Sequence, residues 1–465
     1  MDATSSHPRF PRGFVISQEF AAPEGYVQSS TIPELRYDPV SPCHHYRGRN
    51  VDMAVIGTCV PITRSVSADY NPASDLLPAL ESSRAGFFAR LAEMAGRYIV
   101  IVRARDSSAK GQIEIFHDAT GMRTVFFRGK SAASHARLLV HDAEGDADTF
   151  PHQWGFPGDH APWPDVARLT PNNSLDLHSG KITRYYPEKA PSAISVTDAA
   201  ARVSEWVKYA LINYGAMHGP LKLGLTAGLD SRVTCALTHR SGADCEYFTY
   251  IKNDTRSKND AMAAARISAL LGKDHVTARS ARASQQFSDF LKKNGFYTGN
   301  SSTIAPLSGD HAFLSSNTLE IGRLFYARFM EKFEPPTTAR SCTNFYIYRA
   351  SKKRQKDIEK YGTGRYNEKT EAAFRDFFDR ATFAQACEFL EPFDAYYWEH
   401  RMAAWHAGVV LTRDFACDTF IPFNARKIFD TLLGVSLHDR EMASVFFEIV
   451  ARNCPQLSGL PVNPQ

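Results

Sequence analysis

The stretch of sequence that decides the fold is Leu223-Gly-Leu-Thr-Ala-Gly-Leu-Asp-Ser-Arg232. An apolar run leads into a turn of small residues, and an acid, a hydroxyl and an amphipathic segment follow. This order predicts a strand, a tight loop and a helix N-terminus. Small side chains let the backbone N–H groups of such a loop approach an anion, and the helix dipole adds positive potential. We therefore expect a phosphate-binding loop. Its expected residues are Leu225, Thr226, Ala227, Gly228, Leu229, Asp230, Ser231 and Arg232.

Asp230 is the residue of this loop that indicates a metal site. A carboxylate beside phosphate groups is repelled by their charge unless a divalent cation bridges the two, so we expect Asp230 to be a metal ligand. The loop is not a Walker P-loop, because the G-x-x-x-x-G-K-[ST] spacing and its lysine are absent. The alternative is an ordinary strand-to-helix turn with an acid near its N-cap.

The composition is typical of a water-soluble globular protein of two or three domains. The chain has 465 residues, of which 43% are hydrophobic and 22% charged. Its net charge of +4 is too small and too dispersed to indicate nucleic-acid binding. No apolar run approaches the roughly 18 residues that span a membrane, and the N-terminus lacks the apolar core of a signal peptide. The eight cysteines are scattered without a CxxC pair, which predicts reduced thiols in a cytoplasmic protein.

Two patterns divide the chain. Between residues 51 and 187 the pattern is mostly β, with a helical spacing over 75–95. The predicted strands there are 98–102, 113–116 and 124–127. Asp118-Ala-Thr-Gly121 predicts a hairpin turn between the last two of these strands.

Beyond residue 197, predicted strands alternate with predicted helices. The helices are 197–211, 231–239 and 258–271, and the strands are the one before the loop, 245–250 and one from 275. This alternation indicates a parallel sheet, with the loop at the carboxyl edge where open α/β sheets bind ligands. We also assign Tyr250 to nucleotide binding.

Three segments resemble the asparagine synthetase family. Residues 226–231 resemble its S-G-G-x-D-S pyrophosphatase loop, residues 260–272 resemble its D-x-x-x-A-x-x-x-A-x-x-x-G helix, and residues 96–127 resemble strands of its glutaminase domain. The resemblance implies an α/β protein in two domains. Residues 1–190 would form a β-rich Ntn-hydrolase-like sandwich, and residues 191–465 a parallel-sheet PP-loop domain with a helical C-terminal part. It also implies ATP and Mg²⁺ as cofactors, and cleavage of ATP to AMP and pyrophosphate.

One departure from the family concerns its glutaminase. That activity uses a cysteine at the processed N-terminus, whereas residue 2 here is Asp, the first cysteine is Cys43, and no N-G-E-I-Y-N segment occurs. We therefore expect a glutaminase-type domain without glutaminase activity. An unrelated β-rich domain is the alternative.

The second metal acid of the family lies in an S-G-x-G-x-D-E-L-F-G-G-Y segment, which has no literal copy here. We assign the role to Glu320, within Leu319-Glu-Ile-Gly-Arg-Leu-Phe-Tyr326, because an acid between apolar residues at a strand end needs a cation or an arginine. Asp310, within Ser308-Gly-Asp310, is the alternative. Arg323 would pair with Glu320 or bind phosphate charge.

The acceptor side of the site is less defined. By resemblance to relatives that make β-lactams, Tyr326 and Glu399 would form a catalytic pair that deprotonates an attacking amine, together with Arg323. The alternative for Glu399 is a buried ion pair with Arg401. Two weaker assignments concern cations: Lys427 or Arg440 would neutralise the acyl-adenylate, and the basic run 352–356 would be a solvated helix face or a lid.

The sequence thus predicts an ATP-dependent ligase that adenylates a carboxylate and forms an amide or related C–N bond. Its partners would be a small-molecule carboxylate and ammonia, an amine or an intramolecular amine, with no nucleic acid and no membrane, in specialised metabolism; a homodimer is left open. The alternatives are a non-catalytic scaffold that retains the fold and a sulfur-transferring or RNA-modifying enzyme with the same loop.

Overall fold

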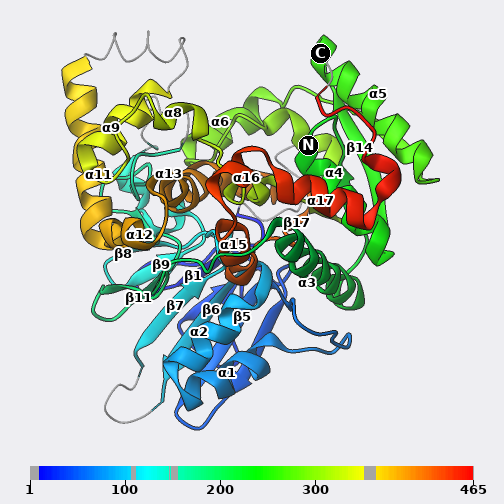
Figure 1. The fold of residues 1–465 in the computed structure, drawn as a ribbon. Helices are drawn as coiled ribbons and strands as arrows, with labels where there is room; N and C mark the ends of the chain where they lie inside the picture. Colours follow the sequence, from blue (N-terminus) through cyan, green and yellow to red (C-terminus); the bar gives the residue numbers. More distant parts are fainter. Residues whose placement is uncertain (1–9, 106–110, 146, 148–154, 350–362, 464–465) are drawn as a thin grey trace.

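The described residues form a mixed α/β fold with three sheets, one of them parallel (Figure 1). The computed structural model describes residues 10–105, 111–145, 147, 155–349 and 363–463. The coarse prediction of an α/β fold with a parallel sheet is confirmed. The finer resemblance of the amino-terminal part to an Ntn-hydrolase, and the boundary at residue 190, stay predictions.

Two six-stranded antiparallel sheets form the amino-terminal part. The first contains, in spatial order, β10 (Ala167–Arg168), β8 (Phe126–Arg128), β9 (Ser131–Ala133), β1 (Phe14–Ile16), β3 (Leu35–Tyr37) and β2 (Val27–Gln28). The second contains β12 (Ile182–Arg184), β11 (Asn173–Asp176), β7 (Ile113–His117), β6 (Met94–Ala104), β5 (Val51–Pro61) and β4 (Cys43–Arg47).

Strand β6 is buried on both faces, which explains its continuous apolar sequence. Ile99 and Ile101 pack with Phe14 of the first sheet, whereas Tyr98 and Val100 point the other way. The second face is covered by two helices, α1 (Pro72–Ser82) and α2 (Arg84–Ala92). The helical spacing over 75–95 is therefore two helices and the start of a strand. The break lies at Ser83, whose extended backbone and hydroxyl cap α2.

The predicted hairpin at Asp118–Gly121 is wrong. Strand β7 belongs to the second sheet and β8 to the first, so this segment crosses between sheets. The physical reason lies in the Asp118 carboxylate, which accepts hydrogen bonds from the N–H groups of Thr120, Met122 and Arg123. These bonds turn the chain away from β7 and out of the second sheet.

The third sheet has five strands, and all of its pairings are parallel. In spatial order they are β15 (His275–Arg279), β14 (Cys245–Ile251), β13 (Leu221–Gly224), β16 (Ala312–Leu314) and β17 (Asp418–Phe420). The chain runs outward from β13 to β14 and β15, and later returns to the other side of β13. The carboxyl end of β13 therefore lies at the topological switch point, where open α/β sheets bind ligands.

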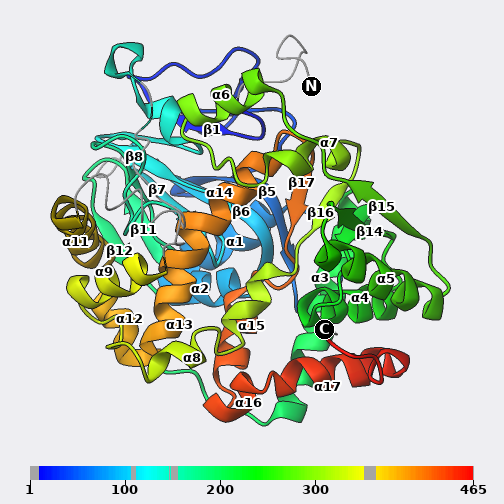
Figure 2. The ribbon, with the colours of Figure 1, turned by 90° about the horizontal axis from the view of Figure 1, so that it is seen from above.

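Helices pack around this sheet and form the rest of the carboxyl-terminal part. Those near the sheet are α3 (Val196–Met217), α4 (Leu229–Ser241), α5 (Thr255–Leu270) and α17 (Ser444–Asn453). Figure 2 shows α4 and α5 beside β14. The remaining helices are α6 (Gln285–Lys293), α7 (Ile304–Leu307), α8 (Ala327–Met330), α9 (Ala339–Tyr348), α11 (Thr363–Ala381), α12 (Phe383–Phe389), α13 (Pro392–Tyr396), α14 (Ala407–Arg413), α15 (Arg426–Leu433) and α16 (Leu437–Glu441).

Short helical segments complete the chain. Among the described residues, five are of 3₁₀ type: η1 (Ala136–Leu139), η2 (Asp142–Glu144), η3 (Ser301–Thr303), η4 (Asn317–Ile321) and η6 (Pro455–Leu457). The sixth, η5 (Tyr397–His406), is a π-helical stretch between α13 and α14. Within the described ranges, no helix combines the length and apolar character that crossing a membrane requires.

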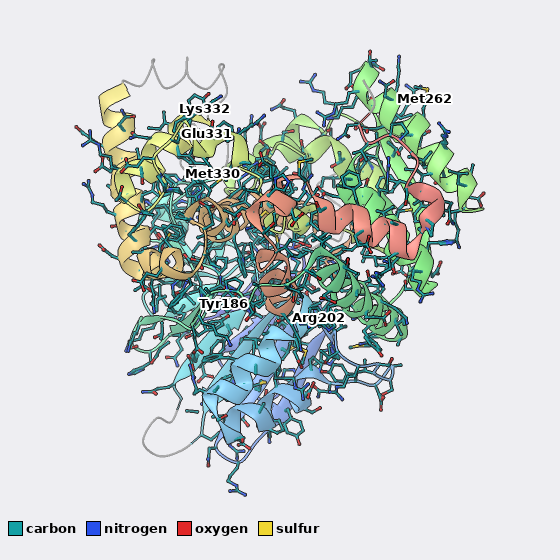
Figure 3. The ribbon with its side chains drawn as sticks, in the orientation of Figure 1. Tyr186, Arg202, Met262, Met330, Glu331 and Lys332 are labelled. Atoms are coloured by element: carbon teal, nitrogen blue, oxygen red, sulfur yellow. The ribbon has the colours of Figure 1, made fainter. Side chains whose placement is uncertain are left out.

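Buried polar contacts join the amino-terminal sheets to the carboxyl-terminal helices. Arg97 of β6 makes a two-pronged ion pair with Asp414, at 2.5 and 2.6 Å, and both side chains are fully buried. Tyr186, labelled in Figure 3 where the two parts meet, donates a hydrogen bond to Asp430 of α15. Such contacts hold the two parts in one arrangement, because separating them would leave buried charges unpaired.

Candidate nucleotide and metal site

The predicted loop lies between β13 and α4, at the carboxyl edge of the parallel sheet. Gly228 is the N-cap of α4 and has no side chain to cap the helix, so the first turn keeps backbone N–H groups for a ligand. The Thr226 N–H donates to the Ser231 hydroxyl at 3.1 Å, and the Gly228 N–H donates to the Thr226 hydroxyl at 3.1 Å. The loop is thus folded by its own small polar side chains.

One amide of the loop already binds an anionic oxygen. The Ala227 N–H donates to Oδ1 of Asp260 at 2.9 Å, and Asp260 comes from α5 on the neighbouring βα unit. The sequence singled out Asp260 only as the start of a family-like helix and gave it no role in the loop. A contact between residues 33 positions apart has no local signal in the sequence.

The acid pair is assembled across β13 and β16. Because Leu223 pairs with Leu314 in parallel register, the segment after β16 returns to the same edge as the loop. There the Arg323 guanidinium (Nη2) lies 2.9 Å from Oδ2 of Asp230 and 3.6 Å from Oε1 of Glu320. The other oxygen of Glu320 accepts a hydrogen bond from the Tyr397 hydroxyl. The structure therefore brings the two predicted metal acids and Arg323 together.

Burial makes this pair of carboxylates costly. Burial raises the pKa of Asp230 to about 7, with Glu320 acting in the same direction and the Arg323 charge opposing it. Burial also raises the pKa of Glu320, while Tyr397, Arg323 and Arg401 lower it. Because burial opposes the ionisation of these two half-buried acids, additional positive charge nearby would stabilise their ionised forms.

The donor set fits Mg²⁺. Oδ1 of Asp230 is buried and has no hydrogen-bond partner in the described residues, so it keeps a lone pair for a cation. Mg²⁺ prefers carboxylate oxygens and is commonly held by one or two carboxylates plus substrate phosphates. In the part of the chain that the structure describes, no cluster of three or more His, Cys, Asp or Glu side chains is arranged around a metal position. A bound metal would therefore depend on phosphate oxygens for the rest of its ligands.

Asp310, the alternative second acid, lies at the opposite edge of the sheet. It precedes β16 and is exposed, and the nearby Ala312 N–H donates to the Pro220 carbonyl just before β13 begins. The amino ends of parallel strands share one edge, so Asp310 cannot reach the loop at the other. The assignment to Asp310 is incompatible with this geometry.

Tyr326 and Glu399 do not form a pair. Tyr326 is buried in an aromatic cluster, edge-on to Phe345 with ring centroids 4.9 Å apart. Both oxygens of Glu399 bind Arg184, at 2.6 and 2.7 Å, and Asn172 donates to it at 2.9 Å. Among the described residues, Glu399 forms its ion pair with Arg184, whereas the sequence offered Arg401 as the alternative partner. Glu399 serves the junction between the two parts of the chain, and Tyr397 is the tyrosine beside the acid pair.

Other residues that the sequence assigned to the site are buried in the core or are bound to other partners. Leu225 and Leu229 are buried in the core, and the Tyr250 hydroxyl donates to the Thr303 carbonyl at 3.4 Å. Lys427 binds Glu93 at 2.6 Å, and Arg440 forms a buried ion pair with Asp394 at 2.7 Å. Each of these two cations is thus committed to a structural partner. The basic run 352–356 lies outside the described residues.

Arg232 holds the C-terminal segment. It is almost fully buried, and its guanidinium donates to the carbonyls of Leu460 and Pro461 at 2.6 and 2.8 Å. Beside it, the Asn463 N–H donates to the Ala227 carbonyl at 3.0 Å. Arg232 therefore faces this segment, whereas the sequence assigned it to phosphate binding.

We expect Arg232→Ala to loosen this segment and the loop beside it. Losing two hydrogen bonds from a charged donor should lower the free energy of unfolding by about 1.5–3 kcal/mol. Hydrogen–deuterium exchange should show faster uptake over residues 457–463. Arg240→Ala, an exposed change on the same helix, is the control and should leave uptake unchanged. Equal uptake in both variants would contradict the anchoring role.

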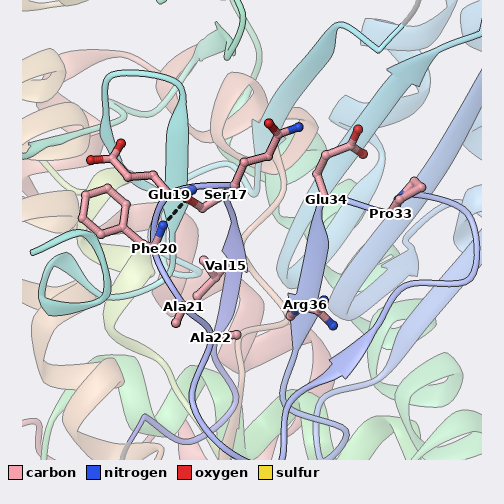
Figure 4. A pocket seen from close by; sticks show the side chains of 10 residues that line it. Val15, Ser17, Glu19, Phe20, Ala21, Ala22, Pro33, Glu34 and Arg36 are labelled. Atoms are coloured by element: carbon pink, nitrogen blue, oxygen red, sulfur yellow. Dashed lines mark hydrogen bonds between the residues drawn. The ribbon is translucent and has the colours of Figure 1, made fainter. Parts of the chain in front are cut away.

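One hollow on the surface of the amino-terminal part is unrelated to the loop. Figure 4 shows this hollow of about 550 Å³, bordered by β1, β3 and the turn after β1. The Phe20 N–H donates to the Ser17 hydroxyl at 2.8 Å and shapes that turn. Glu19, Glu34 and Arg36 line the hollow, and the described residues that border it include none of the loop residues 223–232. Its size therefore does not identify the site.

Comparisons with known proteins add little to this geometry. No family model matches the sequence, and no curated protein matches it. Among solved structures, NMN synthetase from Francisella tularensis aligns at 14% identity over 29% of this chain and 59% of its own, with a TM-score of 0.21. Glutamine-dependent NAD+ synthetase from Acinetobacter baumannii, solved with adenosine diphosphate, aligns at 13% identity over 38% of this chain and 39% of its own, at the same TM-score of 0.21.

A third similar structure is the NH3-dependent NAD synthetase from Campylobacter jejuni. It aligns at 13% identity over 42% of this chain and 97% of its own, with a TM-score of 0.21. The chain thus spans about three fifths and two fifths of the first two structures. These TM-scores are too low to show a shared overall fold, and the roles of the site residues depend on their own geometry.

Proposed function

We propose that the protein is an ATP-dependent ligase that adenylates a small-molecule carboxylate and then forms an amide or related C–N bond. In the first step a carboxylate oxygen of the substrate attacks the α-phosphorus of ATP, and the bond to the α–β bridging oxygen breaks to release pyrophosphate. In the second step a nitrogen nucleophile attacks the acyl carbon and AMP leaves. Ammonia, an amine or an amine of the same substrate supplies that nitrogen.

The observation that carries the proposal is the meeting of Asp230, Glu320 and Arg323 beside the loop at the switch point of the parallel sheet. The amides of the first turn of α4 would bind phosphate oxygens, and the two acids would hold Mg²⁺ against the pyrophosphate. The metal supplies charge neutralisation of the leaving pyrophosphate. Arg323 keeps the two carboxylates together in the free enzyme and, beside bound ATP, offers a forked donor to phosphate oxygens.

The decisive experiment is carboxylate-dependent exchange of labelled pyrophosphate into ATP. Purified protein is incubated with ATP, Mg²⁺ and pools of carboxylates, because the exchange needs the adenylation step alone and no knowledge of the nitrogen donor. We expect exchange with at least one pool and none without Mg²⁺. Absence of exchange with every pool, while MgATP still raises the melting temperature, would favour the scaffold that binds nucleotide without chemistry.

The protein should not hydrolyse glutamine. A glutaminase of the family's type needs a reactive thiol, and burial raises the pKa of all eight cysteines, to about 12 for Cys43 and about 11 for Cys417. A thiol held protonated at neutral pH is a poor nucleophile.

We therefore expect ammonium salts, but not glutamine, to serve as a nitrogen source in product assays. Ammonia release from glutamine, with and without ATP, is the direct measurement. Release above the buffer rate that survives both Cys43→Ala and Cys59→Ala would show that another nucleophile acts and would contradict the prediction.

A further inference from the structure

A second hollow, partly open to solvent, lies between the amino-terminal sheets and the carboxyl-terminal helices. The cavity has a volume of about 410 Å³, which is enough for a small organic molecule. Phe126 of β8, Ala404 of η5 and Leu411 of α14 all line it. Figure 2 shows α14 beside the strands of the amino-terminal part. Phe296, in the turn after α6, adds an aromatic wall.

A buried guanidinium lines this cavity. Arg168 is only 5% exposed, its Nη2 donates to the Gly158 carbonyl at 2.7 Å, and its Nε has no acceptor in the described residues. The charge of Asp159 raises the pKa of Arg168, but the Asp159 carboxylate is itself bound by Arg380 through two hydrogen bonds of 2.6 and 2.7 Å. Burial lowers the pKa of Arg168 to about 10, so the side chain is still charged at neutral pH. A buried charge with unused donors is costly until an anion meets it.

A histidine nitrogen is also left without a partner beside the cavity. His135 lies against the rings of Phe10 and Phe296, with centroid distances of 5.3 and 5.2 Å, and its Nδ1 bonds the Ser134 hydroxyl at 2.7 Å. Its Nε2 is buried and has no partner in the described residues. Burial lowers the pKa of His135 to about 3, so the ring is neutral and offers a polar contact rather than a charge.

The remaining ionisable groups around the cavity do not neutralise the positive charge of Arg168. Lys292 is a second cation at the exposed rim, and His160 is already paired with Asp376 at 2.7 Å. The described residues that line the cavity include neither Asp nor Glu. The walls are thus apolar and aromatic, and the charge they present is positive.

We propose that this cavity is a binding site for a small carboxylic acid with an apolar body. The carboxylate would bind the free donors of Arg168, and the body would pack against Phe126, Phe296 and Leu411. The site is separate from the nucleotide loop. A series of contacts runs from one site to the other. Tyr297 of the cavity contacts Trp405, and Trp405 stacks on the Arg401 guanidinium at 3.8 Å. The Arg401 charge in turn lowers the pKa of Glu320. The inference does not depend on the ligase proposal, because binding here requires neither ATP nor Mg²⁺.

The test uses phenylacetate as the probe, in calorimetry on the full chain without ATP or metal. Phenylacetamide has the same shape without the charge and serves as the matched neutral probe. We expect the wild type to bind phenylacetate about tenfold or more tightly than the amide, as a hydrogen bond to a charged group predicts. Arg168→Gln should weaken phenylacetate binding by about tenfold or more and abolish this preference.

Two further variants keep the test decisive if Arg168→Gln does not fold. Ala404→Leu fills the cavity from η5 and leaves Arg168 in place, so it should abolish binding of both probes. Arg375→Gln removes an exposed charge on α11 and should bind phenylacetate as the wild type does. Equal affinity of the wild type for the acid and the amide would overturn the proposal. Undiminished phenylacetate binding by Ala404→Leu would overturn it as well.

Discussion

Replacing Asp230 by Asn should reduce Mg²⁺-dependent pyrophosphate exchange by about 10²–10³-fold, the effect of removing one charge-stabilising group from a transition state. The substitution removes the charge of the carboxylate but keeps its volume and its contact distance to Arg323. Because burial already raises the pKa of Asp230 to about 7, the neutral amide should fold at least as well as the acid. The expected result is therefore a stable, inactive protein. Exchange kinetics and thermal melting on the same preparation measure both quantities.

Asp310→Asn is the matched control for this experiment. It makes the same chemical change at the other candidate acid, which is exposed at the opposite edge of the sheet. Exchange by this variant should equal that of the wild type. Loss of exchange in Asp310→Asn together with retention in Asp230→Asn at saturating Mg²⁺ would exclude the assignment of the metal site to the loop.

The parts of the site that local sequence determines were predictable. The strand, loop and helix around Gly228 follow from an apolar run, small residues and an amphipathic segment, which are signals within a few positions. The parallel sheet follows from the alternation of strands and helices. Glu320 could be selected because an acid flanked by Leu319 and Ile321 needs a positive partner, and Arg323 lies one helical turn away.

The parts of the site that depend on contacts between residues far apart in the sequence were not predictable. The sequence does not show that Asp260 binds the Ala227 amide, that Tyr397 donates to Glu320, or that Arg232 holds the C-terminal segment. The hairpin prediction failed for the same reason. A turn signal at Asp118–Gly121 says that the chain reverses, but the sheet that the next strand joins is decided by packing far along the chain.

Glu399→Ala should have the largest effect on stability, because it leaves the Arg184 charge buried without its carboxylate. Both side chains are essentially inaccessible to solvent, and the pair is two-pronged, at 2.6 and 2.7 Å. Removing one partner of such a pair costs about 3–5 kcal/mol of folding free energy. Urea unfolding should show a large fall in the midpoint. Glu388→Ala, an exposed change on α12, should leave the midpoint nearly unchanged.

The same variant separates a structural from a catalytic role for Glu399. A general base contributes about 10²–10⁴-fold to rate, so its loss would lower turnover by that factor in a protein of normal stability. In the structure, Glu399 is instead saturated by Arg184 and Asn172, and no hydrogen bond between described residues joins it to Tyr326. We therefore expect Glu399→Ala to retain most of its amide-forming turnover per folded molecule at low temperature, where it is still folded. Arg184→Ala should mimic its instability, and the double variant should lose less stability than the sum of the two, because the buried charge is then gone from both sides. Normal stability together with lost turnover would instead indicate a catalytic role for Glu399.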